Sequence, residues 1–215
     1  MKRMLYLLIL SLLFSVGHAQ DKKQNITHYL FPEFTKGVVL MKTGVTTEAL
    51  LNYNALTEEM IFENSGVRLA VAQMEKIDTI IISGRKFFPV NGKFFELLYH
   101  SKYDLYAEHK CNIKDPGKPS GYGGSSQTSA TSTYSSYFSG GRVYDMKLPE
   151  SVETNPFTIY WLKKDGVLIK FISIRQLSKS FEEKSSQIKK YVKENDVSND
   201  DPKSLIGLIR FLSSN

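Results

Sequence analysis

Few side chains in this sequence could support catalysis or hold a metal ion. Beyond residue 19 the chain has three histidines, His28, His100 and His109, and one cysteine, Cys111. His109 and Cys111 are two positions apart, so on a strand they would share a face at a separation of about 7 Å. A Cys–His nucleophile needs direct hydrogen-bond contact, and a structural zinc site needs further ligands at short spacing. We therefore predict that Cys111 is a half-buried structural residue of a strand rather than a reactive or intermolecular thiol.

The local motifs that bind phosphates or position hydrolase nucleophiles are missing from the sequence. It contains no G-x-S-x-G, P-loop, G-x-G-x-x-G or H-E-x-x-H pattern, and Gly121–Gly124 (GYGG) does not link a strand to a helix. The neighbouring carboxylates Glu58-Glu59 and Glu182-Glu183 are typical of turns and surfaces. Glycosidase carboxylates are positioned by the fold rather than by local spacing, so a hydrolase stays an alternative. We expect no catalytic residue, no metal site and no cofactor.

The N-terminus indicates export. Lys2 and Arg3 precede an apolar stretch over residues 5–16, and small residues then lead to Ala19. This order is that of a secretory signal peptide, and the stretch is short for a membrane span. We predict a periplasmic, outer-membrane-associated or extracellular protein with no transmembrane segment in the mature chain.

Composition constrains the mature chain further. Removal of 19 of the 215 residues leaves 196, enough for one large domain, and lowers the formal net charge from +6 to +4. The positive charges are spread along the chain, whereas nucleic-acid binders usually show a basic stripe, so we expect no nucleic-acid partner. A single cysteine allows no internal disulfide, so stability must come from the hydrophobic core.

Hydrophobic periodicity predicts an antiparallel β-meander, because short apolar runs follow one another with no room for crossover helices. Asn91-Gly92 and Asp165-Gly166 are the strongest hairpin turns. In the run 103–111, alternate residues from Tyr103 to His109 should face the core. The predicted strands are 36–42, 48–54, 60–63, 67–72, 77–83, 86–90, 93–100, 103–111, 142–148, 157–162 and 167–172.

The C-terminus changes to a helical period. Apolar residues from Leu177 to Val192 fall near one helical face, with a possible break at 181–184. A second helix should begin at Pro202, with Asp201 as its N-cap and a wide apolar stripe that must be covered. We interpret the lysines of both helices as a solvated face rather than a binding surface.

These patterns together predict a mainly β, α+β fold. It consists of an antiparallel meander, arranged as a sandwich or an open barrel-like sheet, with two C-terminal helices packed against it. The expected organisation is a signal peptide at 1–19, an N-terminal extension at 20–35, an antiparallel β domain at 36–172 with a long Ser/Gly/Tyr-rich loop at 112–141, and a C-terminal helical segment at 173–215.

The stretch SGYGGSSQTSATSTYSSYFSGG at 120–141 contains no charged residue. Loops of this length are usually either functional or disordered, and pure flexible linkers rarely carry aromatic rings. The rings could contact a ligand or simply pin the loop onto the sheet. Trp161, the sole tryptophan, allows the same alternatives of ligand platform and core anchor. The candidate contact surface is Tyr122, Tyr134, Tyr137, Phe138 and Trp161.

Several phrases of the sequence resemble a loose group of uncharacterised secreted proteins of Bacteroidota. They are FTKGVVLMKTGVTTEALLNYNALTEEMIFEN, IDTIIISGRKFFPV, YGGSSQTSAT and FEEKSSQIKKYVKENDVSNDDPKSLIGLIRFL. The resemblance implies an exported, β-rich envelope or extracellular protein with a helical C-terminus. It implies no activity, cofactor or catalytic residue.

Three functional hypotheses follow. The first is a non-catalytic binding or interaction protein of the cell envelope, with a protein or glycan partner. The second is a periplasmic carrier or chaperone for lipid or lipoprotein, with a cavity lined by groups such as Phe87, Phe94 and Phe95. The third is a hydrolase whose site is assembled without a local motif.

The export prediction can be tested on the N-terminus of the protein recovered from an exporting host. We expect intact-mass measurement and N-terminal sequencing to give a chain that begins at Gln20, because Ala19 occupies the small-residue position before the cleaved bond. A recovered chain that retains Met1 would contradict the prediction.

Overall fold

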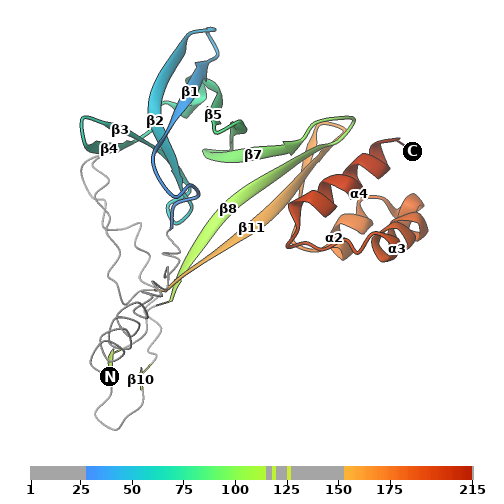
Figure 1. Ribbon diagram of the computed structural model, residues 1–215. Helices are drawn as coiled ribbons and strands as arrows, with labels where there is room; N and C mark the ends of the chain where they lie inside the picture. The colour runs from blue at the N-terminus through green and yellow to red at the C-terminus, as the bar shows by residue number, and fades with distance from the viewer. Residues whose placement is uncertain (1–27, 115–117, 120–124, 127–152, 215) are drawn as a thin grey trace, which may run out of the picture.

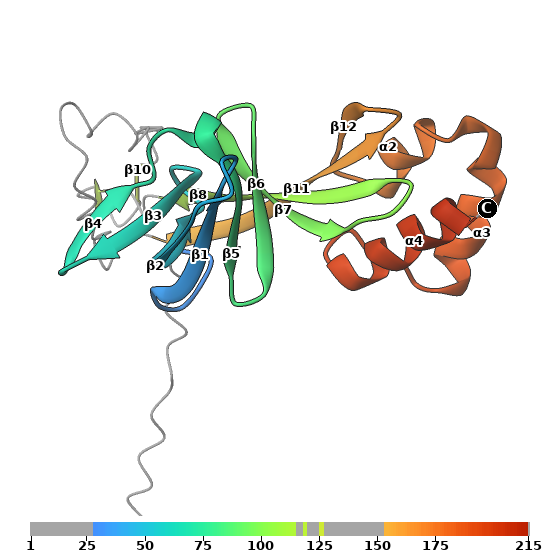
Figure 2. The same ribbon diagram turned by 90° about the horizontal axis from the view of Figure 1, so that it is seen from above.

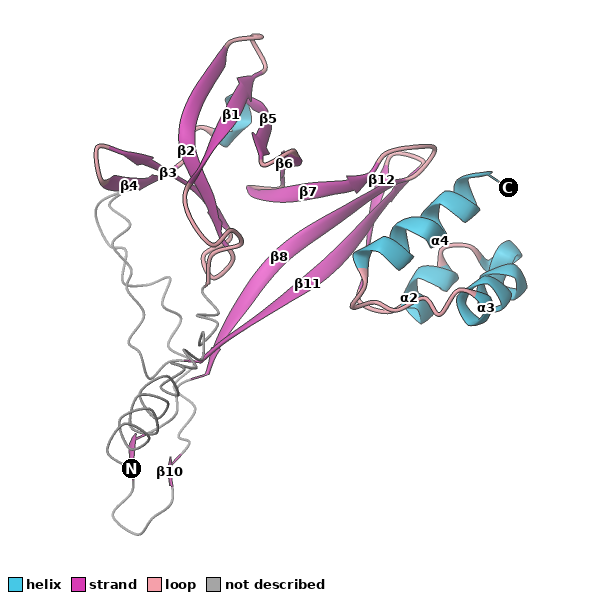
Figure 3. Ribbon diagram, in the orientation of Figure 1, coloured by secondary structure: helices cyan, strands magenta, loops and turns pink. Residues whose placement is uncertain are grey.

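The computed structural model describes residues 28–114, 118–119, 125–126 and 153–214 of the chain (Figure 1). These residues form one ten-stranded antiparallel sheet in the order β12-β11-β8-β7-β6-β5-β1-β2-β3-β4, followed by helices, which confirms the predicted mainly β, α+β class (Figure 3). The strands are β1 (Thr35–Met41), β2 (Thr46–Asn54), β3 (Glu59–Asn64), β4 (Val67–Ala70), β5 (Ile77–Ile82), β6 (Arg85–Val90), β7 (Lys93–Tyr99), β8 (Asp104–Lys114), β11 (Glu153–Lys164) and β12 (Val167–Phe171). A separate pair is formed by β9 (Lys118–Pro119) and β10 (Ser125–Ser126).

Most neighbouring strands are consecutive in the chain, as in the predicted meander. Two pairings are not: β1 lies between β2 and β5, and β8 pairs with β11. A short 3₁₀ turn, η1 (Met74–Lys76), leads from β4 into β5. The β8–β11 pairing runs over 11 residue pairs, from Lys114 opposite Glu153 to Asp104 opposite Lys163. Residues 115–152 therefore connect two neighbouring strands of one sheet, and the predicted strand 142–148 lies outside the described residues.

The predicted hairpin turns have the backbone that their sequences require. Asn91 and Gly92 have φ angles of 50° and 78°, and Asp165 and Gly166 have 52° and 78°. Positive φ at both central residues is the signature of a type I′ turn, whose twist matches that of the flanking strands. Both hairpin predictions are therefore confirmed.

The sheet curls until the β2–β3 connection meets β8. The carbonyl oxygen of Ala55 accepts a hydrogen bond of 2.8 Å from the Cys111 amide, at a point on β8 beyond the end of β7. The Tyr53 hydroxyl donates to the carbonyl oxygen of His109 at 3.2 Å. Inside the curl lies one hydrophobic core, which includes Leu51, Tyr53, Ile80, Ile82, Phe87, Phe94 and Cys111.

The helices cover the other end of the sheet, opposite the curled strands (Figure 2). They are α2 (Ile174–Lys179), the 3₁₀ turn η3 (Glu182–Lys184), α3 (Ser185–Glu194) and α4 (Pro202–Ser214). Their buried side chains form a second core with residues of β8, β11 and β12, including Leu105, Leu162, Phe171, Leu177, Ile188 and Leu208.

The helical segment differs from its prediction in one respect. The predicted first helix is interrupted at 181–184 and forms two separate helices, α2 and α3. The described residues therefore contain three α-helices where the sequence predicts two. Phe181 is fully buried between α2 and η3, and this anchor directs the chain out of the first helix. The predicted cap is confirmed, since the Asp201 carboxylate accepts hydrogen bonds of 3.0 and 3.1 Å from the amides of Lys203 and Ser204.

Gly37 marks the tightest strand contact within the curl. It lies in β1 between β2 and β5, and a Cβ built on it would be 2.6 Å from the carbonyl oxygen of Ile81 and 2.9 Å from Cδ1 of Leu51. We expect Gly37→Ala to lower the free energy of unfolding by about 1–3 kcal/mol, because backbone must move to admit the methyl group. Urea denaturation measures this change.

Gly207→Ala in α4 is the matched control. The nearest atom to its added Cβ is the Tyr191 hydroxyl at 3.2 Å, the end of a side chain that can shift. Alanine is also the better helix former by about 1 kcal/mol, so we expect this variant to be nearly neutral or more stable. Equal destabilisation by both substitutions would show that Gly37 is not a close-packing position.

Candidate functional site

Trp161, the only described member of the predicted contact surface, is held by three neighbours. Its ring stacks on Phe95 with 5.3 Å between centroids, and its Nε1 donates a hydrogen bond of 2.8 Å to Glu108. The Lys170 ammonium lies 6.0 Å from the ring centroid. These contacts integrate the half-buried ring into the sheet's own packing. Tyr122, Tyr134, Tyr137 and Phe138 lie outside the described residues.

The three histidines have separate surroundings. His28 is buried against the ring of Tyr29, and burial lowers its pKa. His100 is exposed and lies 2.6 Å from the Asp104 carboxylate.

Burial raises the pKa of the Cys111 thiol, which opposes formation of the reactive thiolate. Among the described residues no group of three or more His, Cys, Asp or Glu side chains could hold a metal ion.

His109 belongs to a cluster that we call the polar seam, formed by Arg85, Glu96, His109 and Thr158 on four adjacent strands. The Arg85 guanidinium donates two hydrogen bonds to Glu96, of 2.6 and 2.5 Å. His109 Nε2 lies 2.6 Å from the same carboxylate, and its Nδ1 lies 3.5 Å from the Thr158 hydroxyl. On β8, His109 lies between Ala107 of the helix-side core and Cys111 of the curl core, so the seam separates the two cores.

The seam places a hydroxyl, an imidazole and a carboxylate in the order used by hydrolases. Its details favour a structural role. The Thr158–His109 distance is at the limit of a hydrogen bond, and the Arg85 guanidinium neutralises the carboxylate that would have to stabilise an imidazolium. Burial alone would raise the pKa of Glu96, but the hydrogen bonds from Arg85 and His109 outweigh it and lower the pKa to about 2.

The side chains of the carrier hypothesis are tightly packed. Phe87, Phe94 and Phe95 are 0%, 1% and 2% exposed. Phe87 and Phe94 fill the curl core, whereas Phe95 lies on the opposite face against Trp161. Two grooves among the described residues have volumes of about 610 and 500 Å³, and none of the three phenylalanines lines either of them.

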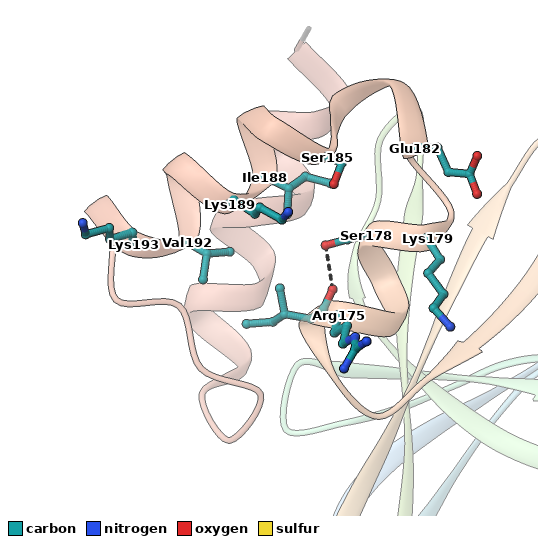
Figure 4. Close-up of a pocket in the computed structure, with 10 residues that line it drawn as sticks. Arg175, Ser178, Lys179, Glu182, Ser185, Ile188, Lys189, Val192 and Lys193 are labelled. Carbon is teal, nitrogen blue, oxygen red and sulfur yellow. Dashed lines mark hydrogen bonds between the residues drawn. The ribbon is translucent and has the colours of Figure 1, made fainter.

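The larger of these grooves lies on the outward side of α2 and α3 and has a volume of about 610 Å³ (Figure 4). We call it the α2–α3 groove. Its apolar lining is Ile174, Ile188 and Val192, and its cationic lining is Arg175 and Lys179 from α2 and Lys189 and Lys193 from α3. Glu182 is the one acidic residue among the described groups that line it.

The fold fixes both walls of this groove. Leu177 of α2 and Ile188 of α3 are fully buried in the helix-side core. The end of α2 is tied to the sheet because Lys164 donates to the carbonyl oxygen of Ser180 at 2.7 Å, with its ammonium 4.5 Å from the Phe181 ring centroid. The two helices therefore hold a set spacing with their cations facing outward.

The four groove cations form no ion pair with any described residue. All four are exposed, and the ion pair of α3 is elsewhere on that helix, between Lys190 and Glu194 at 3.9 Å. Sequence reasoning assigns these lysines to a solvated face, because helical periodicity shows only that they lie away from the core. Their grouping depends on how α2 and α3 turn about Phe181, which no local pattern specifies.

The seam makes a prediction about pH. Because the pKa of Glu96 is lowered to about 2 from 4.5, its ionised form stabilises the folded state by roughly 3 kcal/mol. This stabilisation is present above pH 4.5 and is lost as the pH falls from about 4.5 toward 2. We expect Glu96→Gln to be less stable at pH 7, and its further loss of unfolding free energy between pH 7 and pH 3 to be about 2 kcal/mol smaller than that of the wild type.

Urea denaturation of both proteins at the two pH values measures the difference. Glu63→Gln is the control, since Glu63 pairs with Arg68 in a partly exposed salt bridge whose side chains are 24% and 41% exposed. Such pairs contribute about 1 kcal/mol or less, so this control should follow the wild type closely. Parallel pH profiles for wild type and Glu96→Gln would show that the seam does not hold a charged carboxylate.

No helix among the described residues is long and apolar enough to span a membrane. No known family model, curated protein sequence or solved structure matches the chain. The resemblance to secreted Bacteroidota proteins and the export of the chain therefore stay predictions, and function has to be inferred from the chain's own geometry.

Proposed function

We propose that this protein is an exported, non-catalytic binding protein and that the α2–α3 groove is its ligand site. The observation that carries the proposal is the set of four exposed cations, without ion pairs among the described residues, around an apolar floor. A ligand that fits both features is anionic and partly apolar.

The charge pattern of α3 supports a binding role. Lys189 and Lys193 are four residues apart, where like charges destabilise a helix by roughly 0.2–0.5 kcal/mol. Lys190, which follows Lys189, is instead paired with an opposite charge, because Glu194 lies four residues after it. The helix thus pairs its charges away from the groove and leaves them uncompensated at the groove, which is expected where a ligand supplies the negative charge.

The alternatives receive less support from the described residues. The polar seam lacks an open, well-aligned nucleophile, which disfavours the hydrolase, and the phenylalanines of the carrier hypothesis are packed against other side chains. The described lining of the groove contains no aromatic ring on which the bases of a nucleic acid could stack, so the groove favours a ligand of another class.

The proposal can be tested with two dyes that differ by one charge. We expect 1-anilinonaphthalene-8-sulfonate to bind the native protein, seen as enhanced fluorescence, and N-phenyl-1-naphthylamine, which lacks the sulfonate, to bind much more weakly. The double variant Lys189→Glu/Lys193→Glu should bind the sulfonate dye about tenfold more weakly, since attraction at two positions becomes repulsion.

Lys190→Glu, on the same helix but outside the groove, is the matched control and should bind the dye like the wild type. Circular dichroism checks that all variants are folded. Equal binding of both dyes, or equal loss in the groove and control variants, would contradict an anionic ligand site in the α2–α3 groove.

A further inference from the structure

We infer that the occupant of the α2–α3 groove is an acidic amphipathic α-helix of a partner protein. This inference rests on the proposed function and names the class of ligand. Such a helix carries an apolar stripe flanked on both sides by Asp or Glu. Helices of this kind commonly bind by laying their apolar face into a hydrophobic groove.

The cations form two rows, one on each of the helices that line the groove. Arg175 and Lys179 are four residues apart on α2, and Lys189 and Lys193 are four residues apart on α3. Four residues of an α-helix advance about 6 Å, so each row presents two charges at that spacing. Figure 4 shows the α3 row on one side of the groove and the α2 row on the other.

Both helices contribute to the part of the apolar floor that a ligand can reach. Val192 lies between the α3 cations in sequence, Ile174 precedes Arg175 at the start of α2, and both are half-buried, whereas Ile188 is fully buried. A partner helix repeats its apolar positions and its flanking charges every three or four residues. It can therefore lay its stripe over the floor and place its acids beside both rows, whose charges are spaced at about 6 Å.

Other anionic ligands match only part of this site. A single-chain lipid has its charge at one end and would leave most of the two rows without a counter-charge. A flat anionic membrane could meet the exposed cations but could not fill the hollow between them. An acidic polysaccharide supplies repeated charges but no apolar stripe for Ile174 and Val192.

Glu182 gives the bound helix a direction. It precedes α3, whereas Lys193 lies near the end of α3, and Figure 4 places the two at opposite ends of the groove. Acidic side chains of the partner are attracted at the Lys193 end and repelled at the Glu182 end. A Lys or Arg near one terminus of the partner helix should therefore lie at the Glu182 end, and so select one of the two opposite directions in which the helix can lie in the groove.

The test uses a fluorescein-labelled, side-chain-stapled peptide of about 14 residues, because unstapled helices of this length are marginal in water. Leucines form its apolar stripe and glutamates flank the stripe on both sides. We expect fluorescence anisotropy to show binding to the wild-type protein at low salt, weakened about tenfold at roughly 0.3 M salt because the ion pairs are exposed. A scrambled peptide of the same composition, with leucines and glutamates mixed around the helix, should bind at least about tenfold more weakly.

Charge exchange makes the test specific. Lys189→Glu/Lys193→Glu should lose the acidic peptide and gain affinity for a peptide with lysines on one flank of the stripe, whereas Lys190→Glu should behave like the wild type. Reversing Glu182 with Glu182→Lys should remove the preference for a peptide that carries a lysine at one terminus over the same peptide with it at the other.

The outcomes separate the two proposals. If the sulfonate dye binds in the groove but the scrambled peptide binds as well as the helical one, the helical occupant is overturned and the anionic site stands. If vesicles containing phosphatidylglycerol bind while the peptides do not, a membrane surface replaces the partner helix. If neither dye nor peptide depends on Lys189 and Lys193, the proposed function itself fails.

Discussion

Both hydrophobic cores of this protein depend on the same strand, β8. Its side chains Leu105 and Ala107 pack under the helices, as does Tyr103 just before the strand, and Cys111 toward its far end packs in the curl. Because these residues share one face of an uninterrupted strand, a register shift of one residue would expose the strand's part of both cores together. The 11 residue pairs with β11 and the Ala55–Cys111 hydrogen bond hold that register on either edge.

Charged groups also fix the pairing of these strands, because apolar contacts are non-directional and would tolerate other packings of the same side chains. On one face of the sheet, Glu96 receives hydrogen bonds from β6 and contacts His109 on β8. On the opposite face, Glu58 in the β2–β3 connection pairs with Lys93 and Lys110, each at 2.5 Å, and so ties the curl to β7 and β8. A buried carboxylate is costly without partners, so alternative packings that separate these groups are disfavoured. The helical end can then present its cations on a stable base.

Features that depend only on residues close together in the chain can be predicted from the sequence. The Asn91-Gly92 and Asp165-Gly166 turns, the Asp201 cap and the alternation of β8 are local, and all are found in the structure. The β1–β5 pairing, the contact of Ala55 with Cys111 and the Arg85–Glu96 ion pair join residues from 11 to 56 positions apart or strands out of order, so no local pattern contains them. The groove is missed for the same reason, because its two rows of cations meet only after Phe181 turns the chain between α2 and α3.

We propose that ligand recognition takes place on the helical end of the molecule rather than on the sheet around Trp161. The most direct measurement is an amide ¹H–¹⁵N NMR titration of the protein with the acidic helical peptide. We expect the shifted resonances to belong to residues 174–193 of α2, η3 and α3, and those of β8 and β11 around Trp161 to stay unchanged. Shifts centred on Trp161 and its strand neighbours, or no shifts in either region, would contradict it.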